Sequence, residues 1–144
     1  MQIVQGPGYV TLLHEIDHST RVIQTDGRPH VPQHIRLWQG DSVGHWEGHT
    51  LVVDTTNFTT KTQFRGSSEN LHVVERFTRT GPKTLLYRFT VEDPSTWERS
   101  WTGEYPWNAT DEKLYEYACH EGNYSLGGML RGARQKEADE RIRN

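Results

Sequence analysis

The chain is poor in cysteine and has no long apolar run. Cys119 is the one cysteine among 144 residues, which excludes an intrachain disulfide framework and a cysteine-rich zinc module. No apolar stretch approaches the roughly 20 residues that a membrane-spanning helix needs. The first residues, Met1 to Gln5, have neither a charged leader nor a cleavage site, so they do not form a signal peptide. They are typical of the middle of a strand.

Several common functional signatures are also missing. The formal charge is −3 and the basic residues are scattered, which argues against a nucleic-acid partner. The sequence contains no Gly-x-Ser-x-Gly, no phosphate-binding loop and no dinucleotide fingerprint. A nucleophilic Cys119 would need a base, but His120 is its neighbour in sequence and would face the other side of a strand. We expect a buried, inert thiol.

Aromatic residues are plentiful where aliphatic ones are few. Only 33% of the residues are hydrophobic, yet the chain has five tryptophans, six tyrosines and four phenylalanines. A core built on a few large side chains suits a sheet that closes around a pocket. The length of 144 residues fits one domain.

Repeated hairpin signals predict the fold class. Residues 40–58 form two alternating segments around a Glu47-Gly48 turn, and Leu71 to Val91 repeats the design around Gly81-Pro82. Alternation predicts an all-β fold, an antiparallel β-barrel or strongly curled lipocalin-like sheet, with under about a fifth of the residues helical. We assign 1–130 to this domain, with 122–132 as a glycine-rich loop, and 131–144 to a short charged helix or tail. The other expected strands are 9–16, 21–24, 97–105 and 114–119.

Glu75 is the most unusual residue of the second hairpin. Alternation places it on the apolar face with Val73 and Phe77, opposite Tyr87 or Phe89 of the next strand. A bare carboxylate there costs several kcal/mol, so Glu75 must be protonated, paired or bound to a ligand. Adjacent strand residues face opposite ways, which excludes Arg76 as its partner. The remaining candidates are a tyrosine hydroxyl, His120 or a ligand.

Residues 14–18 match H-E-x-x-H, a pattern that binds zinc when it lies on a helix. The β-branched flanks favour a hairpin over residues 9–24 instead. On an extended strand, residues four apart lie about 13 Å apart and cannot hold one ion. His14 and His18 are therefore candidate metal ligands, together with His120, only if the chain bends.

Five residues outside the second hairpin are also candidates. Arg28 and His30 sit in an Asp-Gly-Arg-Pro-His turn suited to a polar or anionic substrate, or to a solvated turn. Asp54 lies in an otherwise apolar strand and is either buried and functional or solvent-facing. His120 opens a glycine-rich loop. Trp46, in Gly44-His45-Trp46-Glu47-Gly48, resembles the Gly-x-Trp of lipocalin-type barrels and is either a plug or a substrate contact.

A resemblance to a known family covers almost the whole chain. It is carried by four segments: GDSVGHWEGHTLVVDTTNF, FRGSSENLHVVERFTR, TLLYRFTVEDPSTW and YEYACHEGNY. They resemble the C-terminal part of a large family of secreted bacterial proteins of unknown function, abundant in soil acidobacteria. The resemblance implies a longer protein with a signal peptide, and hence a periplasmic or secreted location. It supplies no catalytic residues. His49 and His14 depart from the family's usual residues, which weakens the zinc interpretation.

Two functional hypotheses follow. The first is a small hydrolase-like enzyme acting on a small polar or anionic substrate, with Glu75, Asp54 and His120 as catalytic residues and Arg28, His30, Tyr87 and Trp46 as substrate contacts. A divalent metal, zinc, is compatible with it. The alternative is a non-catalytic module that binds an apolar or glycan ligand. A strand that begins at the first residues also predicts a homodimer through an open sheet edge.

Overall fold

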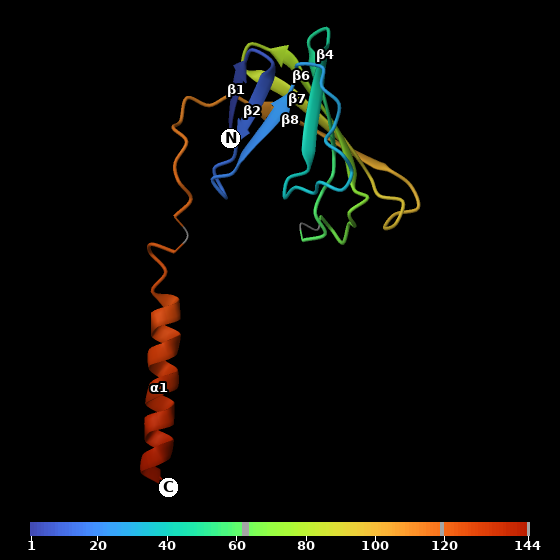
Figure 1. The fold of residues 1–144 in the computed structure, drawn as a ribbon. Helices are drawn as coiled ribbons and strands as arrows, with labels where there is room; N and C mark the ends of the chain where they lie inside the picture. The colour runs from blue at the N-terminus through green and yellow to red at the C-terminus, as the bar shows by residue number, and fades with distance from the viewer. Residues whose placement is uncertain (62–63, 119, 144) are drawn as a thin grey trace. The chain divides into compact units, whose positions relative to one another are not determined.

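The structure is a computed structural model that describes residues 1–61, 64–118 and 120–143. Its main element is one eight-stranded, strongly curled sheet in which the strands follow chain order, as Figure 1 shows. The strands are β1 (Gln2–Gly6), β2 (Tyr9–Leu13), β3 (Thr20–Gln24), β4 (Asp41–Glu47), β5 (Thr50–Thr56), β6 (His72–Gly81), β7 (Thr84–Glu92) and β8 (Trp101–Asn108). The all-β prediction of a curled sheet is thus confirmed.

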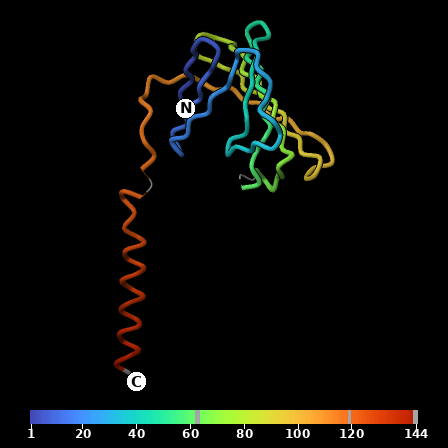
Figure 2. The backbone as a smooth tube through the Cα atoms, in the orientation of Figure 1, coloured from blue at the N-terminus to red at the C-terminus, as the bar shows by residue number. Residues whose placement is uncertain are grey.

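Neighbouring strands pair antiparallel, with one exception. β3 meets β4 in parallel through Gln24 and Val43, and the long loop 25–40 connects them. Figure 2 follows this loop in pale blue. The named strands leave β1 and β8 as the two edges, so the sheet described is open and not a closed barrel. Such edges are what the predicted homodimer would need, and that homodimer stays a prediction.

The inner face of the sheet carries the hydrophobic core. Register places alternate residues of β2 to β6 on this face, and the fully buried ones form a single cluster: Val10, Leu12, Ile23, Leu51, Val53 and Phe77. Tyr87 and Trp107 pack against this cluster, with their rings stacked at a centroid separation of 4.5 Å. Gly44 permits the close packing, because a Cβ there would lie 2.9 Å from Ile23 Cγ2.

Three sequence expectations differ from the structure. The predicted 97–105 strand begins at Trp101 and ends at Asn108, while residues 114–118 form no strand. Those residues alternate like a strand, but the sheet gives them no neighbour, and an unpaired strand lacks its hydrogen bonds. The helix α1 (Ser125–Arg143) begins inside the segment expected to be a loop, since good helix formers between the glycines outweigh their cost.

The C-terminal part is a second unit. The chain divides into two compact units, Met1–Leu114 and Tyr115–Asn144, where the sequence placed its boundary after residue 130. The helix has 19 residues of 144, under the predicted fifth. It has no apolar stripe, as expected from its charged sequence. No helix in the described ranges combines the length and the apolar character that crossing a membrane requires.

Candidate functional site

A band of polar side chains crosses the inner face of the sheet. Arg21, Ser42, Thr55, Glu75 and Tyr87 come from β3, β4, β5, β6 and β7 in turn, and hydrogen bonds join them. We call these five residues the inner band. Ser42, Thr55 and Glu75 are almost fully buried, at 4%, 1% and 4% exposure. One polar residue per strand at one level of the sheet creates a continuous network beside the core.

Glu75 is paired, as its position on the apolar face required. Arg21 donates to both of its oxygens, through Nη1 to Oε1 at 3.1 Å and through Nη2 to Oε2. The Tyr87 hydroxyl donates to Oε1 at 2.8 Å. A tyrosine hydroxyl, one of the three candidate partners, is therefore confirmed, and Arg76 pairs with Glu47 instead. A bidentate guanidinium makes strong, charge-assisted hydrogen bonds to a carboxylate.

Arg21 is held on its other sides by hydroxyl groups. Its Nε donates to Ser42 Oγ at 2.9 Å, and Nη2 donates to Thr55 Oγ1 at 2.9 Å. Ser42 and Thr55 also bond each other at 3.0 Å. Burial, with the nearby Glu75 carboxylate adding to it, raises the pKa of Tyr87 above its ordinary value of 10.0. Tyr87 therefore remains a neutral donor, and the band carries one fixed positive and one negative charge.

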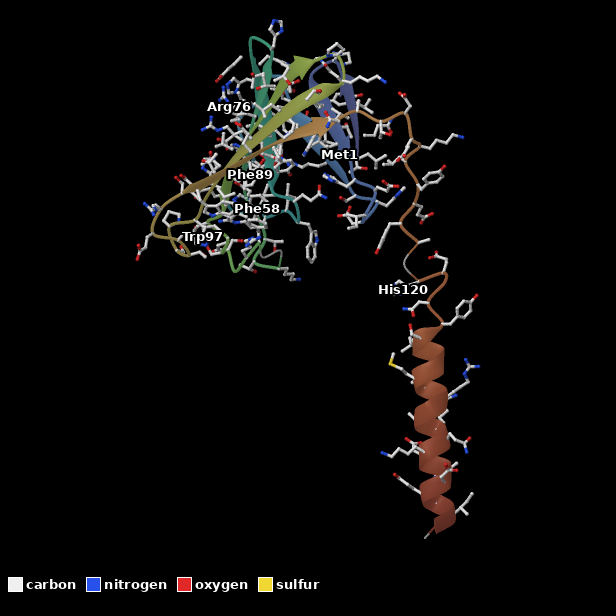
Figure 3. The ribbon with its side chains drawn as sticks, turned by 180° about the vertical axis from the view of Figure 1, so that it is seen from behind. Met1, Phe58, Arg76, Phe89, Trp97 and His120 are labelled. Atoms are coloured by element: carbon white, nitrogen blue, oxygen red, sulfur yellow. The ribbon has the colours of Figure 1, made fainter. Side chains whose placement is uncertain are left out.

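A pocket of about 290 Å³ opens beside the inner band. Arg21, Thr55 and Glu75 form one part of its lining, and Val73 and Phe58 supply apolar walls. The loop between β2 and β3 contributes His14 and Ser19, and Gln39 comes from the loop before β4. The pocket thus lies where β2 and β5 end and where β3, β4 and β6 begin. Figure 3 labels Phe58, which follows β5, and Phe89, which lies on β7.

The β2–β3 loop presents polar groups to this pocket. The His14 N–H bonds the Ser19 carbonyl at 2.9 Å, which closes the loop, and His18 takes a positive φ of 51° at its turn. Ser19 Oγ is buried with no well-aligned hydrogen-bond partner in the described chain. It lies close enough to Asp17 that hydroxyl and backbone N–H of Ser19 both lower the pKa of that carboxyl. Asp17 is consequently ionised at neutral pH, on the lining of the pocket.

A second network covers the outer face of the same sheet. His30 bonds Asp41 through Nδ1 at 2.9 Å and Asp54 through Nε2 at 3.0 Å. His72 bonds the other Asp54 oxygen through Nε2 at 2.9 Å and Glu92 through Nδ1 at 3.1 Å. We call these five residues the outer chain. Burial lowers the pKa of His72, but the bonds to Asp54 and Glu92 outweigh it, so the net shift is upward.

The predicted site residues fall into separate groups. Glu75 and Tyr87 meet in the inner band, whereas Asp54 and His30 meet in the outer chain on the opposite face. Asp54 and Glu75 therefore do not share a site, because Asp54 pairs with Val74 and the face alternates at each residue. His120 belongs to the Tyr115–Asn144 unit and is exposed. Cys119 lies outside the described residues.

The remaining candidates lie away from the inner band. Trp46 is 49% exposed near the hairpin turn, at the end of β4 remote from the pocket. Arg28 is paired with Asp26 on its own exposed turn, which leaves the solvated-turn interpretation in place. Of the H-E-x-x-H histidines, only His14 lines the pocket.

The predicted hairpin over residues 9–24 is confirmed, with β2 and β3 in register from Tyr9–Gln24 to Leu13–Thr20. His14 and His18 therefore do not share a helix face. Within the described ranges, no three His, Cys, Asp or Glu residues are grouped so that they could hold a metal ion.

Arg21, Ser42 and Thr55 are the residues that sequence reasoning missed. Arg21 alternates with Val22 and Ile23 on β3, so it shares a face with the fully buried Ile23. A charged residue on an apolar face was the signal that identified Glu75, and it applied equally to Arg21. The pairing across strands three apart could not be read, because it depends on how the sheet curls.

No protein-family model, no curated protein and no solved structure matches this chain. The resemblance to secreted bacterial proteins remains a prediction, and the function has to be inferred from the geometry of the site.

Proposed function

We propose that the domain binds a small, polar, uncharged molecule in the pocket beside the inner band. The observation that carries this proposal is the Arg21–Glu75 pair in the pocket lining, because it offers hydrogen bonds without a net charge. The volume of about 290 Å³ lies near the lower end of ligand-binding pockets. Apolar walls with a few convergent polar groups are the usual character of such a site.

Donors remain available for a ligand. A guanidinium has five N–H groups. Bonds to Ser42, Thr55 and the two Glu75 oxygens use four of them, which leaves one N–H on Nη1. The buried Ser19 hydroxyl lies beside the Asp17 carboxylate without a well-aligned hydrogen bond in the described chain, and it can turn toward a ligand instead.

Charge argues for an uncharged ligand. Arg21 and Glu75 cancel, and the ionised Asp17 adds a negative charge to the lining. An anion would be repelled by Asp17 and would have to compete with Glu75 for Arg21. We therefore favour the binding function, for which the sequence suggested an apolar or glycan ligand, and propose a ligand that is polar and uncharged. It presents an acceptor to Arg21 and an apolar portion to Phe58 and Val73.

The hydrolase hypothesis gains no support from the inner band. A general base needs a free lone pair directed at its substrate. Glu75 accepts three hydrogen bonds, two from Arg21 and one from Tyr87, and taking a proton would remove the negative charge that balances the Arg21 guanidinium. Asp54 is on the other face. Glu75 is therefore best interpreted as the residue that orients Arg21.

The test is a fragment screen by NMR on the isotope-labelled chain. Fragments are offered as matched pairs, a primary amide and the corresponding carboxylate. We expect the amides to shift the signals of Ser19, Thr55 and the Arg21 side chain, and the carboxylates to shift them less. Stronger binding of the carboxylates, or no response at these residues to any fragment, would contradict the proposal.

A matched pair of variants locates the binding. Val73 lines the pocket and Val74 is its neighbour on the outer face of β6. Val73→Phe fills the pocket and should abolish the amide-induced shifts, whereas Val74→Phe should leave them. Equal responses of the two variants would place the fragments elsewhere.

A further inference from the structure

The outer chain requires protons to be intact. Both ring nitrogens of His30 and both of His72 face carboxylate oxygens. A neutral imidazole has a single N–H, so its other nitrogen would direct a lone pair at a carboxylate. Only the imidazolium form donates on both sides. With both histidines protonated, charges alternate along Asp41, His30, Asp54, His72 and Glu92, and every contact is attractive.

The outer chain also fixes one half of the loop 25–40. Asp41 Oδ2 accepts from His30 Nδ1 and from the Val31 backbone N–H, the latter at 3.0 Å. His30 thereby ties the start of the loop to β4 and β5.

The other half of the loop is held without titratable groups. Asn57, which is buried and has a φ of 59°, donates from Nδ2 to the carbonyls of Val31, Pro32 and Ile35 at 3.0–3.1 Å. The Leu37 N–H bonds the Asn57 carbonyl at 2.9 Å. An amide side chain does not titrate in the neutral range, so these bonds are independent of pH.

The charged groups that face the two histidines come from β4, β5 and β7. His30 faces Asp41 from β4 and Asp54 from β5, and His72 faces Asp54 from β5 and Glu92 from β7. On the loop itself, Arg28 pairs with Asp26 and also feels the Asp41 charge. The outer chain has three carboxylates, Asp41, Asp54 and Glu92. When His30 and His72 both lose their protons, the negative charge of these carboxylates is no longer balanced within the outer chain.

We propose that the outer chain is a proton-dependent catch for residues 26–30 of the loop and for the N–H group of Val31, whose carbonyl remains bonded to Asn57. With His30 and His72 protonated, the catch is closed and Val31 lies against Asp41. When His30 loses its proton, one of its two ring nitrogens directs a lone pair at Asp41 or Asp54, that contact becomes repulsive, and this half of the loop opens. The Asn57 bonds hold the second half in place. Gln39 is the residue of this loop that lines the pocket, and it follows the half that Asn57 holds. Opening of the first half therefore does not depend on whether the pocket is occupied.

The experiment is amide hydrogen exchange by NMR on the full chain between about pH 6 and pH 8.5, corrected for intrinsic exchange. The Val31 amide reports the catch and the Leu37 amide is the internal reference. We expect the Val31 amide to lose protection as the pH rises, whereas the Leu37 amide keeps its protection. Nitrogen shifts at about pH 6 should show His30 and His72 protonated on both nitrogens.

Two variants complete the test. His30→Gln should leave Val31 weakly protected at every pH. His45→Gln is the matched control, because His45 lies on the same face but bonds one carboxylate, Glu47, through Nε2 at 3.1 Å. It should keep the pH dependence of Val31. The proposal is overturned if Val31 and Leu37 lose protection in parallel, if Val31 does not respond to pH, or if His30→Gln retains the response.

Discussion

The two faces of one sheet hold their polar networks by different means. On the inner face, Arg21 lies between Glu75 and two hydroxyls, with side-chain exposures of 16% for Arg21 and 6% for Glu75. On the outer face, two histidines lie between carboxylates, and Glu92 is 51% exposed. Arginine keeps its charge at any physiological pH, whereas histidine does not. The inner band therefore keeps its charges at any physiological pH, but losing one of its residues should cost much stability. The outer chain depends on pH, and losing one of its residues should cost little.

The largest expected effect is the removal of the charge on Glu75. Glu75→Gln keeps the shape but leaves the buried Arg21 without its counter-charge, and breaking a buried pair in this way costs about 3–5 kcal/mol. Glu92→Gln is the control, because it breaks a solvent-exposed pair worth about 0–1 kcal/mol. Chemical denaturation of the unsubstituted chain and of the two variants measures the difference in the free energy of unfolding. Equal losses in the two variants would show that the faces do not differ in burial as described.

Loss of the Tyr87 hydroxyl should come next. Tyr87→Phe removes one donor to Glu75, and a hydrogen bond to a charged group contributes about 1.5–3 kcal/mol. The loss stays below that of Glu75→Gln, since Arg21 still satisfies the carboxylate. Tyr105→Phe serves as reference, because Tyr105 is 46% exposed at the edge strand. Denaturation midpoints that drop equally for both tyrosines would remove Tyr87 from the inner band.

The fold was accessible from the sequence because hairpins are local. The two-residue turns Gly48-His49 and Pro82-Lys83, each one residue later than predicted, fix the registers of β4–β5 and β6–β7, and alternation then assigns Glu75 and Tyr87 to one face. The end of the sheet was not accessible. Residues 114–118 alternate as β8 does, and only the presence of a neighbouring strand decides which segment pairs. That information is not in the segment itself.

The site was accessible only in part, for a related reason. The face of Glu75 follows from local alternation, but the face of Asp54 relative to Glu75 depends on the register between β5 and β6. Those strands are joined by the long segment 57–71, which fixes no register. His30 reaches Asp54 from a loop, and no periodicity describes loops. Contacts between strands that follow each other closely were predictable, and contacts across loops were not.

A smaller effect is expected when threonine is replaced by valine on each face of the sheet. Thr55→Val removes a hydroxyl that bonds Arg21 and Ser42, and an unmade buried hydrogen bond costs about 1–2 kcal/mol. Thr90→Val removes a hydroxyl that bonds Thr102 across β7 and β8 at 3.0 Å near solvent, where changes stay within about 0.5 kcal/mol. Thermal unfolding of both variants gives the comparison. A larger loss for Thr90→Val would contradict the permanence assigned to the inner band.

The smallest expected effect is the pH dependence of global stability. The pKa of His72 is raised in the folded chain above its ordinary value of 6.5. The folded state therefore binds the proton more tightly than the unfolded state, and its stabilising contribution is complete below about pH 6.5. It is lost as the pH rises through the folded-state pKa. Because the outer chain is partly exposed, the total loss of stability should stay below about 1 kcal/mol and shrink in high salt.

Denaturation at about pH 6 and pH 8.5 measures this loss of stability. His72→Gln should flatten the profile, whereas Tyr87→Phe should lower the curve without changing its slope. If stability still depends on pH in His72→Gln, the titration belongs to another group. If the pH dependence disappears in Tyr87→Phe, the inner band and the outer chain are energetically coupled.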